Sequence, residues 1–427
     1  MKTIVVAGAM LAGSVFAAVP VIDPASISAR QDGGHTVVIS YTMNPATDGD
    51  TDPAIITVDV LTNYTENAEV KWASIGGEHL TTLSGDVNKI VGHTADYKHN
   101  ILWDPKKEGL PKLKFDANEV KVEITAWATN SPPAYWIIDL THPAGRTYDR
   151  YYPNAEQIPL GVTNALYKTD RLVMRRIPAK GVTWKQGASE VDLGFRAYRY
   201  VTFSYDYYMA IYELTGAQYN YLKPSSWSGS SGMLPYVQNL ANIRSDSVDT
   251  DWPANGHETI TGSGVIPSGI RTKTGLKFDL PTAAEWEFAC RAGSSTKYCN
   301  GDTEADLAKV AWYYGSDGTI HEVGTKDPNA WGLYDMHGNR WEWALTRHAY
   351  RSNAPVWDPL GLTRAETQNS DKTVVGYTDW LASWCLMGGH AADSTYGVAD
   401  HCANYSYREF PRKSYTTGAC RLTIPIP

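Results

Sequence analysis

The sequence predicts an α+β protein of two domains, in which an all-β domain precedes an irregular domain with few helices. Two observations lead to this prediction. Segments before about residue 130 are β-branched and alternate in part between apolar and polar side chains, whereas the rest of the chain has long glycine-rich loops and twelve of the fifteen tryptophans. The length of 427 residues suits two domains, at roughly 100–200 residues each.

The chain begins MKTIVVAGAMLAGSVFAAVP, with one lysine, a short apolar run and small residues before the proline. This order is typical of a secretory signal peptide, here residues 1–18. The apolar run is too short to cross a bilayer, because a spanning helix needs about 20 apolar residues. We therefore expect a secreted, periplasmic or cell-surface protein without a membrane span.

Residues 19–131 contain three clear strand patterns, at 35–43, 54–62 and 119–129. Clusters of Asp, Gly, Asn and Pro separate them, as expected of turns. About 110 residues of this kind favour an immunoglobulin- or fibronectin-like sandwich. No catalytic constellation stands out in this domain, so we expect it to be a spacer or a docking module.

Two segments of the second domain, residues 134–427, predict helices. Each begins with a threonine that is followed three residues later by a side chain able to reach back to the threonine N–H. The pairs are Thr215 with Gln218 and Thr282 with Glu285, and both fit the capping-box pattern. Two helices in so long a stretch, among glycine-rich loops, indicate an irregular α+β domain.

Composition excludes one class of function and favours another. The net charge is −8 and the sequence pI is about 5.8, so the basic face that phosphate binding requires is not expected, and neither is nucleic-acid binding. The chain has 27 Tyr and 15 Trp against 7 Phe. Aromatic side chains with a polar group favour half-buried and binding surfaces. The oligomeric state stays open.

Four ordered motifs resemble the formylglycine-generating enzyme family, also called sulfatase-modifying factors. They are YELTGAQY at 212–219, LPTAAEWEFACRAG at 280–293, PNAWGLYDMHGNRWEW at 328–343 and the pair Gly388-Gly389. The resemblance covers residue 134 to the C-terminus. It implies a C-type-lectin-like fold for the second domain, with little regular structure, extensive loops and a compact aromatic core.

The resemblance implies a structural calcium site in the third motif. Its ligands would be the side chains of Asp335 and Glu342 and the backbone carbonyls of Gly338 and Arg340. Calcium takes about six to eight oxygens, and a glycine turn can aim carbonyls inward. The other interpretation is that Asp335 caps the turn and Glu342 pairs with an arginine. Three tryptophans of this motif are expected in the core: Trp331, Trp341 and Trp343.

Five cysteines lie in the last third of the chain. In an exported protein they can oxidise, and an odd count leaves one over. The resemblance implies a bond from Cys290 to Cys420 and a structural role for Cys402, whose mate would be Cys299. Cys385 would then be left over. A chain with all five thiols reduced is the other possibility.

The catalytic sulfurs of the family are missing. The family's enzymes hold copper(I) between two cysteines that follow the glycine pair, since a soft cuprous ion prefers thiolates. Counting from Gly389 places these positions at Asp393 and Val398. Sulfatase activation and bound copper are therefore not expected. His390, Asp393 and His401 could instead hold iron(II) or zinc. A metal-dependent oxidoreductase is thus the competing function, although iron is not expected either.

Recognition is the function that the sequence favours. Residues 390–407 mix Tyr, Ser, Asn, Asp and His, the side chains of adaptable binding surfaces, and loops on a rigid scaffold commonly bind ligands. We expect a protein or glycan ligand, contacted by His390, Asp393, Tyr396, His401, Tyr405 and Tyr407. The segment also resembles the variable region of proteins diversified by diversity-generating retroelements, which implies hypervariability. An ordinary loop in an inactive relative is the other interpretation.

Overall fold

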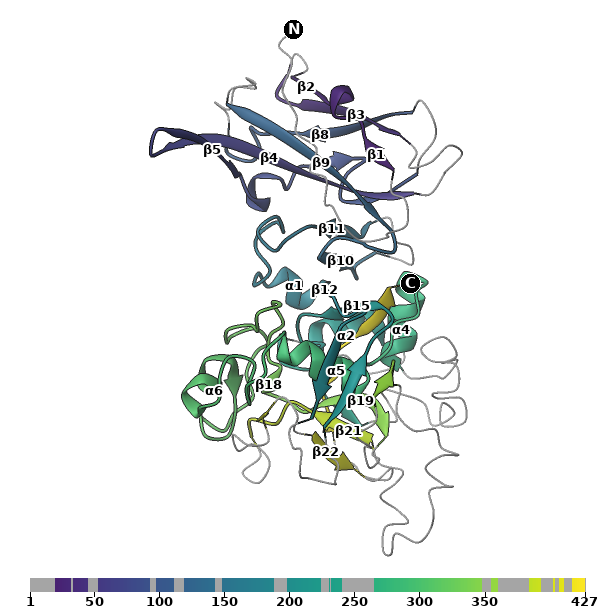
Figure 1. Ribbon diagram of the computed structural model, residues 1–427, viewed down its shortest axis with the longest axis vertical. Helices are drawn as coiled ribbons and strands as arrows, with labels where there is room; N and C mark the ends of the chain where they lie inside the picture. The colour runs from purple at the N-terminus through teal and green to yellow at the C-terminus, as the bar shows by residue number, and fades with distance from the viewer. Residues whose placement is uncertain are drawn as a thin grey trace, which may run out of the picture. The chain divides into compact units, whose positions relative to one another are not determined.

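The computed structural model describes residues 20–31, 34–44, 53–92, 97–110, 119–142, 148–187, 198–223, 230, 232–239, 265–347, 355–359, 384–392, 402–403, 407–410 and 417–426. Contacts divide the chain into two units, Met1–Ile137 with Thr147–Asn164, and Ile138–Arg146 with Ala165–Pro427. The fold class is α+β, mostly strands with few helices (Figure 1). The predicted signal peptide, residues 1–18, lies outside the described residues.

The first unit is built from two antiparallel sheets. One has the order β1-β3-β8-β6, with β2 beside β3, and the other has the order β5-β4-β7, with β9 beside β4. The strands at 35–43, 54–62 and 119–129 are confirmed as β3, β4 and β9. The bounds are β1 Val21–Ile22, β2 Ser28–Gln31, β3 Val37–Asn44, β4 Ala54–Glu66, β5 Glu69–Ser74, β6 Ser84–Gly85, β7 Lys89–Val91, β8 Lys98–Trp103, β9 Val120–Ala128, β10 Tyr135–Asp139 and β11 Arg150–Tyr152.

Both sheets of the first unit contribute to one apolar core. Val37 and Ile39 of β3 lie in the same cluster as Val58 of β4 and Val122 of β9. Along the first half of β9 every second residue is buried, because successive side chains of a strand point to opposite faces. The unit is therefore all-β, while its assignment to an immunoglobulin or fibronectin type stays a prediction.

The segment Thr147–Asn164 belongs to the first unit, although the sequence predicts the second domain from residue 134 onward. Its strand β11 pairs antiparallel with β10. The N–H of Tyr151 also donates to the carbonyl of Asn88, at 2.8 Å, beside β7. Backbone hydrogen bonds assign this segment to the first unit. The predicted boundary followed amino-acid composition, which does not show such bonds.

The second unit is assembled from short strands in several small sheets. Strand β12 pairs with β15 and β15 with β24, and the other groups are β13-β14-β20, β16-β23, β17-β18 and β19-β21-β22. The strand bounds are β12 Arg171–Ile177, β13 Thr183–Gln186, β14 Arg199–Thr202, β15 Asp206–Ala210, β16 Gln238–Asn239, β17 Ala311–Trp312, β18 His337–Gly338, β19 Glu342–Arg347, β20 Val356–Trp357, β21 Trp384–Met387, β22 Tyr407–Phe410, β23 Thr417–Gly418 and β24 Thr423–Ile426.

The two predicted helices are confirmed, and both predicted capping boxes are formed, at Thr215 for α2 and at Thr282 for α5. The structure adds helices that the sequence analysis missed; one of them, α6, has the same box with Asp306 in the reaching position. The helix bounds are α1 Leu166–Thr169, α2 Gly216–Leu222, α4 Val265–Thr274, α5 Ala283–Arg291 and α6 Glu304–Val310. Within the described part of the chain, no helix has the length and apolarity to span a membrane.

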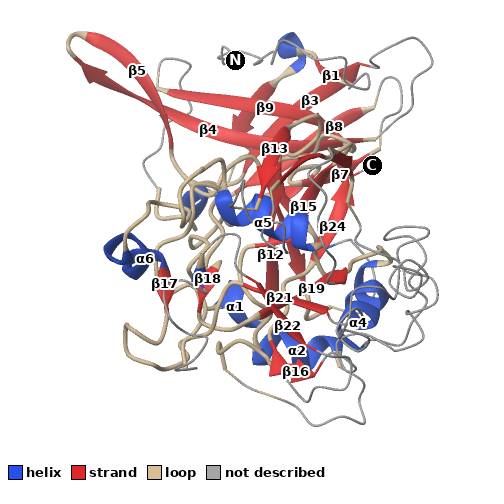
Figure 2. Cartoon of the chain, turned by 60° about the horizontal axis from the view of Figure 1, so that its bottom comes forward, coloured by secondary structure: helices blue, strands red, loops and turns tan. Residues whose placement is uncertain are grey.

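Helix α5 is buried on every side, whereas its sequence predicts one buried face. Figure 2 shows it among the strands and loops of the second unit. Even Glu285 and Glu287 have no exposed surface. Glu285 caps its own helix, and Glu287 accepts from Arg291 at 2.8 Å. Charged side chains are therefore part of the interior of this unit, and a cluster of them forms the candidate site.

Candidate functional site: a buried charge cluster beneath a loop

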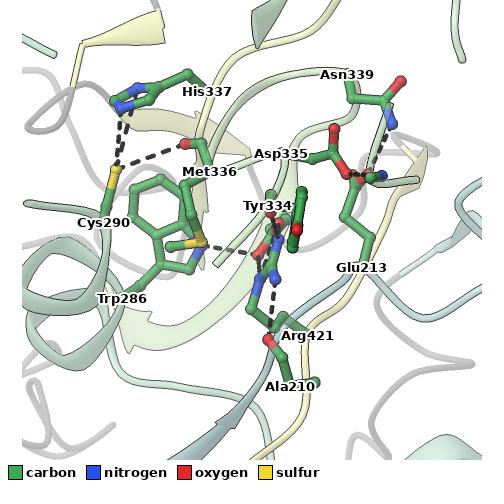
Figure 3. Close-up of polar contacts among 12 residues, drawn as sticks. Ala210, Glu213, Trp286, Cys290, Tyr334, Asp335, Met336, His337, Asn339 and Arg421 are labelled. Carbon is green, nitrogen blue, oxygen red and sulfur yellow. Dashed lines mark hydrogen bonds and ion pairs between the residues drawn. The ribbon is translucent and has the colours of Figure 1, made fainter. Parts of the chain in front are cut away.

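A turn of the third motif, residues 335–342, runs through the interior of the second unit (Figure 3). Asp335, Gly338 and Asn339 all have φ in the left-handed region, at 56°, 77° and 51°. A Cβ at Gly338 would lie 1.9 Å from the carbonyl oxygen of Trp312, so only glycine fits there. The tight backbone aims successive side chains in different directions.

Three buried carboxylates surround one buried guanidinium. Glu213, Glu342 and Arg421 are 0% exposed, and Asp335 is 2% exposed. Arg421 donates to Glu342 from Nη2 at 2.7 Å and from Nε at 3.0 Å. The indole N–H of Trp286 donates to the same carboxylate at 2.7 Å. Glu342 is therefore fully engaged by N–H donors.

Arg421 also satisfies the backbone around it. Its Nη1 donates to the carbonyl of Ala210 at 2.9 Å, and its Nη2 donates to the carbonyl of Tyr334 at 2.8 Å. Figure 3 shows the guanidinium between these two segments. Ala210 is the last residue of strand β15 and Tyr334 lies in no strand, so Arg421 supplies donors to carbonyls at the edge of the regular structure. Arg421 is thus a cross-link as well as a counter-charge.

The other two carboxylates each keep one oxygen without a partner. Glu213 accepts from Asn339 Nδ2 at 2.9 Å, and Asp335 accepts from the N–H of Gly324 at 2.6 Å. Their second oxygens, Oε1 and Oδ1, have no hydrogen-bond partner among the described residues. Burial, reinforced by the charge of Glu342, raises the pKa of Glu213 well above its usual range. Burial likewise raises the pKa of Asp335 to about 6.

These contacts describe the surroundings of the predicted calcium ligands, while calcium binding itself stays a prediction. Glu342 pairs with an arginine, as in the second interpretation of its role, and its oxygens are not open to a cation. Asp335 bonds to Gly324 rather than within its own turn, and its Oδ1 is open. Glu213, which the sequence analysis missed, offers a second open oxygen. The described residues contain no group of three His, Cys, Asp or Glu side chains arranged to hold a metal.

Arg340 has a side-chain role in addition to its predicted carbonyl role. Its Nη1 lies 2.8 Å from His390 Nε2, while the N–H of Ala392 lies 3.1 Å from His390 Nδ1. Burial lowers the pKa of Arg340, and the charge of Glu213 acts in the opposite direction. Both ring nitrogens of His390 thus lie beside N–H groups, and because a neutral imidazole accepts at only one nitrogen, at most one of these two contacts is a hydrogen bond.

The described ends of the candidate binding loop rest on this turn. Gly338 donates to the carbonyl of Gly388 at 2.6 Å, and Ala391 donates to the carbonyl of Asn339 at 2.9 Å. On the other side, His337 Nδ1 lies 2.6 Å from the carbonyl of Cys402. The backbone of Tyr407 follows in β22, paired with Met387 of β21. The remaining predicted contacts lie outside the described residues: Asp393, Tyr396, His401 and Tyr405.

The structure corrects the predicted cysteine pairs. All five cysteines are among the described residues, and none is in a disulfide, so neither Cys290–Cys420 nor Cys299–Cys402 is formed. The sulfur of Cys290 lies 3.6 Å from His337 Nε2, and Cys299 donates to the same nitrogen through its N–H at 3.1 Å. Cys299 is thus the electrostatic neighbour of Cys290, while Cys420 precedes Arg421 beside the carboxylates.

The thiols and the histidine of this region are neutral groups. Burial raises the pKa of Cys299 and of Cys402 to about 12, and raises that of Cys290 well above its usual value. Burial also lowers the pKa of His337 to about 4. Thiolates, which bind soft metals and attack substrates, are therefore disfavoured here. Trp341 and Trp343 are 2% exposed, which confirms their predicted place in the core.

The fold and this turn define a domain class. The sulfatase-modifying factor enzyme 1-like domain matches residues 177–383, a stretch that includes α2, α5 and α6, the three helices with capping boxes, and the whole turn. The chain therefore carries a domain of the sulfatase-modifying factor family, and the resemblance predicted from the motifs is confirmed.

Two curated relatives share part of the chain. The formylglycine-generating enzyme of Mycobacterium tuberculosis is 42% identical over 79 residues, which are 16% of this chain and 26% of that protein. The serine/threonine-protein kinase pkn1 of Chlamydia pneumoniae is 38% identical over 73 residues, which are 17% of this chain and 11% of that protein. The chain thus spans about a quarter or less of the length of these relatives.

Two solved structures have a similar course over much of their length. Treponema denticola variable protein 1 is 23% identical and covers 60% of this chain and 96% of its own, with a TM-score of 0.39. PvdO from Pseudomonas aeruginosa is 18% identical and covers 60% of this chain and 94% of its own, with a TM-score of 0.42. At these values the likeness says nothing of what this chain binds.

Proposed function

We propose that this chain is a non-catalytic ligand-binding protein that presents residues 390–407 from a rigid sulfatase-modifying-factor-type domain. The observation that supports it is the anchoring described above. Gly388 and Ala391 on one side, and Cys402 on the other, bond to the buried turn at 337–339. A short loop with both ends fixed to a rigid interior is an arrangement suited to recognition.

The chemistry of the thiols supports the non-catalytic part of the proposal. A copper(I) oxidase needs thiolates, and the two expected positions are Asp393 and Val398. Cys402, the nearest cysteine that follows the glycine pair, is 0% exposed, and its pKa is raised. Cys402 therefore offers no ionised, open thiolate for copper(I) chemistry.

The ligand in this proposal is a protein or a glycan on another surface. The domain takes a C-type-lectin-like form, the chain is exported, and the first unit acts as an immunoglobulin- or fibronectin-like spacer. Tyrosine and small polar side chains adapt to many ligands at low entropic cost, which suits a hypervariable loop. A near-copy of the last coding bases beside a reverse-transcriptase gene would support diversification, and its absence would leave an ordinary binding loop.

The test of binding uses arrays of glycans and of cell-surface proteins, with the purified full chain as the probe. We expect saturable binding that is lost in the double variant Tyr396→Ala, Tyr405→Ala. The matched control is Tyr314→Ala, which removes a tyrosine that is 47% exposed on another loop and should leave binding unchanged. Loss of binding in both variants, or in neither, would contradict the loop as the ligand site.

A second measurement separates the competing oxidoreductase. The chain is loaded with iron(II), zinc or copper(I), and bound metal is counted by mass spectrometry before oxygen uptake is measured with a cysteine-containing peptide. We expect no stoichiometric metal and no uptake above the background. One metal per chain that is lost in His390→Ala and His401→Ala, together with oxygen uptake, would overturn the non-catalytic proposal.

We also propose that calcium binds at the charge cluster, held by the open oxygens of Asp335 and Glu213 together with the carbonyls of Gly338 and Arg340. The bound ion would offset the excess of three carboxylates over one arginine. A ligand at about 100 times its Kd stabilises a fold by about 2.7 kcal/mol. Calcium should therefore raise the thermal midpoint over that in a chelator, and Asp335→Asn should abolish the difference. Equal midpoints for the parent chain would refute this site.

A further inference from the structure

Two cysteines of one short stretch of chain contact the same nitrogen of a buried histidine. Cys290 lies near the end of α5 and is 0% exposed. Its Sγ is 3.6 Å from His337 Nε2, and Figure 3 shows the sulfur facing this ring. The backbone N–H of Cys299 donates to the same Nε2 at 3.1 Å. The fold therefore brings these two residues together at one ring atom.

The ring of His337 is held in one tautomer and one orientation. Its Nδ1 lies 2.6 Å from the carbonyl oxygen of Cys402, and a carbonyl can only accept, so Nδ1 carries the proton. Nε2 is then the nitrogen with the lone pair, which accepts from the N–H of Cys299 and lies beside the thiol of Cys290. Tyr298 packs edge-on against the ring, with centroids 5.9 Å apart. The histidine is thus a fixed point between the two cysteines.

The backbone at each cysteine is also fixed. The carbonyl of Cys290 accepts from Asn329 Nδ2 at 3.1 Å. On the other side, Tyr298 and Gly301 exchange backbone bonds, with N–H to carbonyl distances of 2.9 and 3.4 Å, and this closes a tight turn around Cys299. A disulfide requires a narrow range of approach between its two residues. Here the fold, and not a chance encounter, sets that approach.

The two thiols are electrostatic neighbours. Burial is the main cause that raises the pKa of Cys290, and interaction with the thiol of Cys299 is the next. The raised pKa values of Cys402 and Cys420 have no other cysteine among their causes. Burial penalises a thiolate, whereas a disulfide is uncharged and suits the same surroundings. The structure thus gives Cys290 a different neighbour from the Cys420 that the family resemblance implies.

We propose that Cys290 and Cys299 are a redox modification site, at which a small disulfide such as oxidised glutathione converts the two thiols into an intramolecular disulfide. In the first exchange, the sulfur of the half-buried Cys299 bonds to one sulfur of the oxidant, and one glutathione thiol leaves with the Cys299 proton. In the second exchange, the sulfur of Cys290 bonds to that of Cys299, and the other glutathione leaves with the Cys290 proton. The protein loses two electrons and two protons, and the oxidant gains them.

The new bond links the end of α5 to the turn at 298–301. It restricts the unfolded chain, so oxidation raises the thermal midpoint of the second unit by about 5–10 °C, and a thiol reductant restores the original value. The other three cysteines stay reduced. The site is independent of the loop at 390–407, and it requires no ligand there.

The test equilibrates the purified full chain with mixtures of reduced and oxidised glutathione, both in native buffer and in urea. Because buried thiols are slow nucleophiles, each mixture is held until its composition stops changing, and the remaining thiols are then trapped with N-ethylmaleimide. Trypsin cuts after Arg291 and Lys297, so the disulfide appears as a pair of linked peptides. We expect this pair and three trapped thiols per chain.

The comparison with urea measures what the fold contributes. Half-oxidation of the native chain should need a ratio of oxidised to reduced glutathione at least about tenfold lower than in urea, because a fixed approach raises the effective concentration of one thiol at the other. Cys299→Ser should abolish the linked peptides and the rise in the thermal midpoint. Cys385→Ala, which removes a cysteine outside the pair, is the matched control and should keep both. Circular dichroism checks the fold of each variant.

Four results would overturn the proposal. They are five trapped thiols at every glutathione ratio, a glutathione adduct that stays on Cys299, a link from Cys290 to Cys420 or from Cys299 to Cys402, and a native ratio that is no lower than the ratio in urea. The last result would mean that the folded geometry does not favour the bond, even though the two residues are close in the chain.

Discussion

The interiors of the two units are built from different chemistry. The core of the first unit joins apolar side chains of two sheets, such as Ile39, Val60 and Trp103. The interior of the second unit contains ionisable groups at 0% exposure, among them Glu213, Glu342 and Arg421. Apolar burial stabilises a fold without preference for a ligand. A buried charge needs an opposite charge or hydrogen bonds to compensate it. Where this compensation is incomplete, a ligand can supply the rest and the buried group becomes a candidate binding site.

The difference follows from the amount of regular structure. In the first unit, long strands satisfy one another's backbone groups, so side chains are left to pack. In the second unit, short strands and turns leave carbonyls to be satisfied by side chains. Asn329 donates to the carbonyls of Ala289 and Cys290 at the end of α5, and Arg421 does the same for Ala210. Polar residues enter this interior because the backbone needs them.

The largest effect should come from the guanidinium of the cluster. Arg421→Met leaves the buried Glu342 without a counter-charge, with only the Trp286 N–H still bonded to it, so we expect the second unit to lose about 3–5 kcal/mol of unfolding free energy. Urea unfolding followed by peptide-resolved hydrogen exchange assigns the loss to one unit. The double variant Arg421→Met, Glu342→Gln should recover part of it, because the amide is uncharged. A loss below about 1 kcal/mol, as for an exposed pair, would show that the cluster is not buried.

The matching change in the first unit is Ile39→Ala, at a side chain that is 0% exposed. Removing buried methyl groups costs about 2–5 kcal/mol, through lost transfer energy and the cavity that remains. The same hydrogen-exchange measurement should place this loss in the first unit. The loss of unfolding free energy in Ile39→Ala should not depend on pH, since no titrating group belongs to this apolar cluster. A loss that varied with pH would contradict the contrast between the two interiors.

Next in size is a pH dependence confined to the second unit. The pKa of Asp335 is raised from 3.8 to about 6, so the native state holds this proton more tightly than the unfolded state. The resulting stabilisation is complete below the unfolded pKa and is lost as the pH rises through about 6. It amounts to at most about 3 kcal/mol, because one pKa unit is about 1.4 kcal/mol.

A difference measurement isolates this group. His337, whose pKa is lowered to about 4, titrates in the same range with the opposite sign, and its stabilisation is lost as the pH falls. The unfolding free energies of the parent chain and of Asp335→Asn are measured without calcium from about pH 4 to about pH 7. Subtracting one curve from the other cancels the contribution of His337 and of every other group that both proteins share. The parent should lose more stability than the variant as the pH rises. Parallel curves would mean that Asp335 titrates normally in the folded protein.

The regular parts of the molecule could be predicted because their signals are local. Alternation over a few residues gives β3, β4 and β9, and Thr282 with Glu285 gives the start of α5. The turn at 335–342 could be found as a motif, and Trp341 and Trp343 could be placed in the core, whereas Trp331, which is predicted there too, is only half-buried. These features depend on neighbours in the chain, which a single sequence records.

The partners within the cluster could not be predicted, because they lie far apart in the chain. Glu342 and Arg421 are 79 residues apart, and Glu213 and Asn339 are 126 residues apart. Glu213 is inside a recognised motif, YELT, but nothing local shows that its carboxylate is buried. The family resemblance singles out Cys420, whereas the side chain that crosses the interior is that of its neighbour Arg421.

A smaller effect compares two helix caps of one unit. Thr282→Ala and Thr303→Ala each remove a hydroxyl that accepts from the third residue of its helix, in α5 and α6. A lost cap costs about 0.5–2 kcal/mol. We expect the upper part of this range for Thr282, which is buried, and the lower part for Thr303, where water can replace the hydroxyl. Urea midpoints measure both, and a larger loss at Thr303 would reverse this ranking of buried over exposed caps.

The last prediction concerns reactivity and should leave stability almost unchanged. Among the five cysteines, Cys299 alone is not fully buried, and Cys385, Cys402 and Cys420 are at most 4% exposed. Its pKa is raised to about 12, so it should react slowly with iodoacetamide at neutral pH, yet before the others. Peptide mass spectrometry over time gives the order of labelling, with the urea-unfolded chain as the control for equal intrinsic reactivity. Cys402 or Cys420 reacting first would mean that the second unit opens locally around its charged interior, whereas Cys299 first means that the cluster stays closed on this timescale.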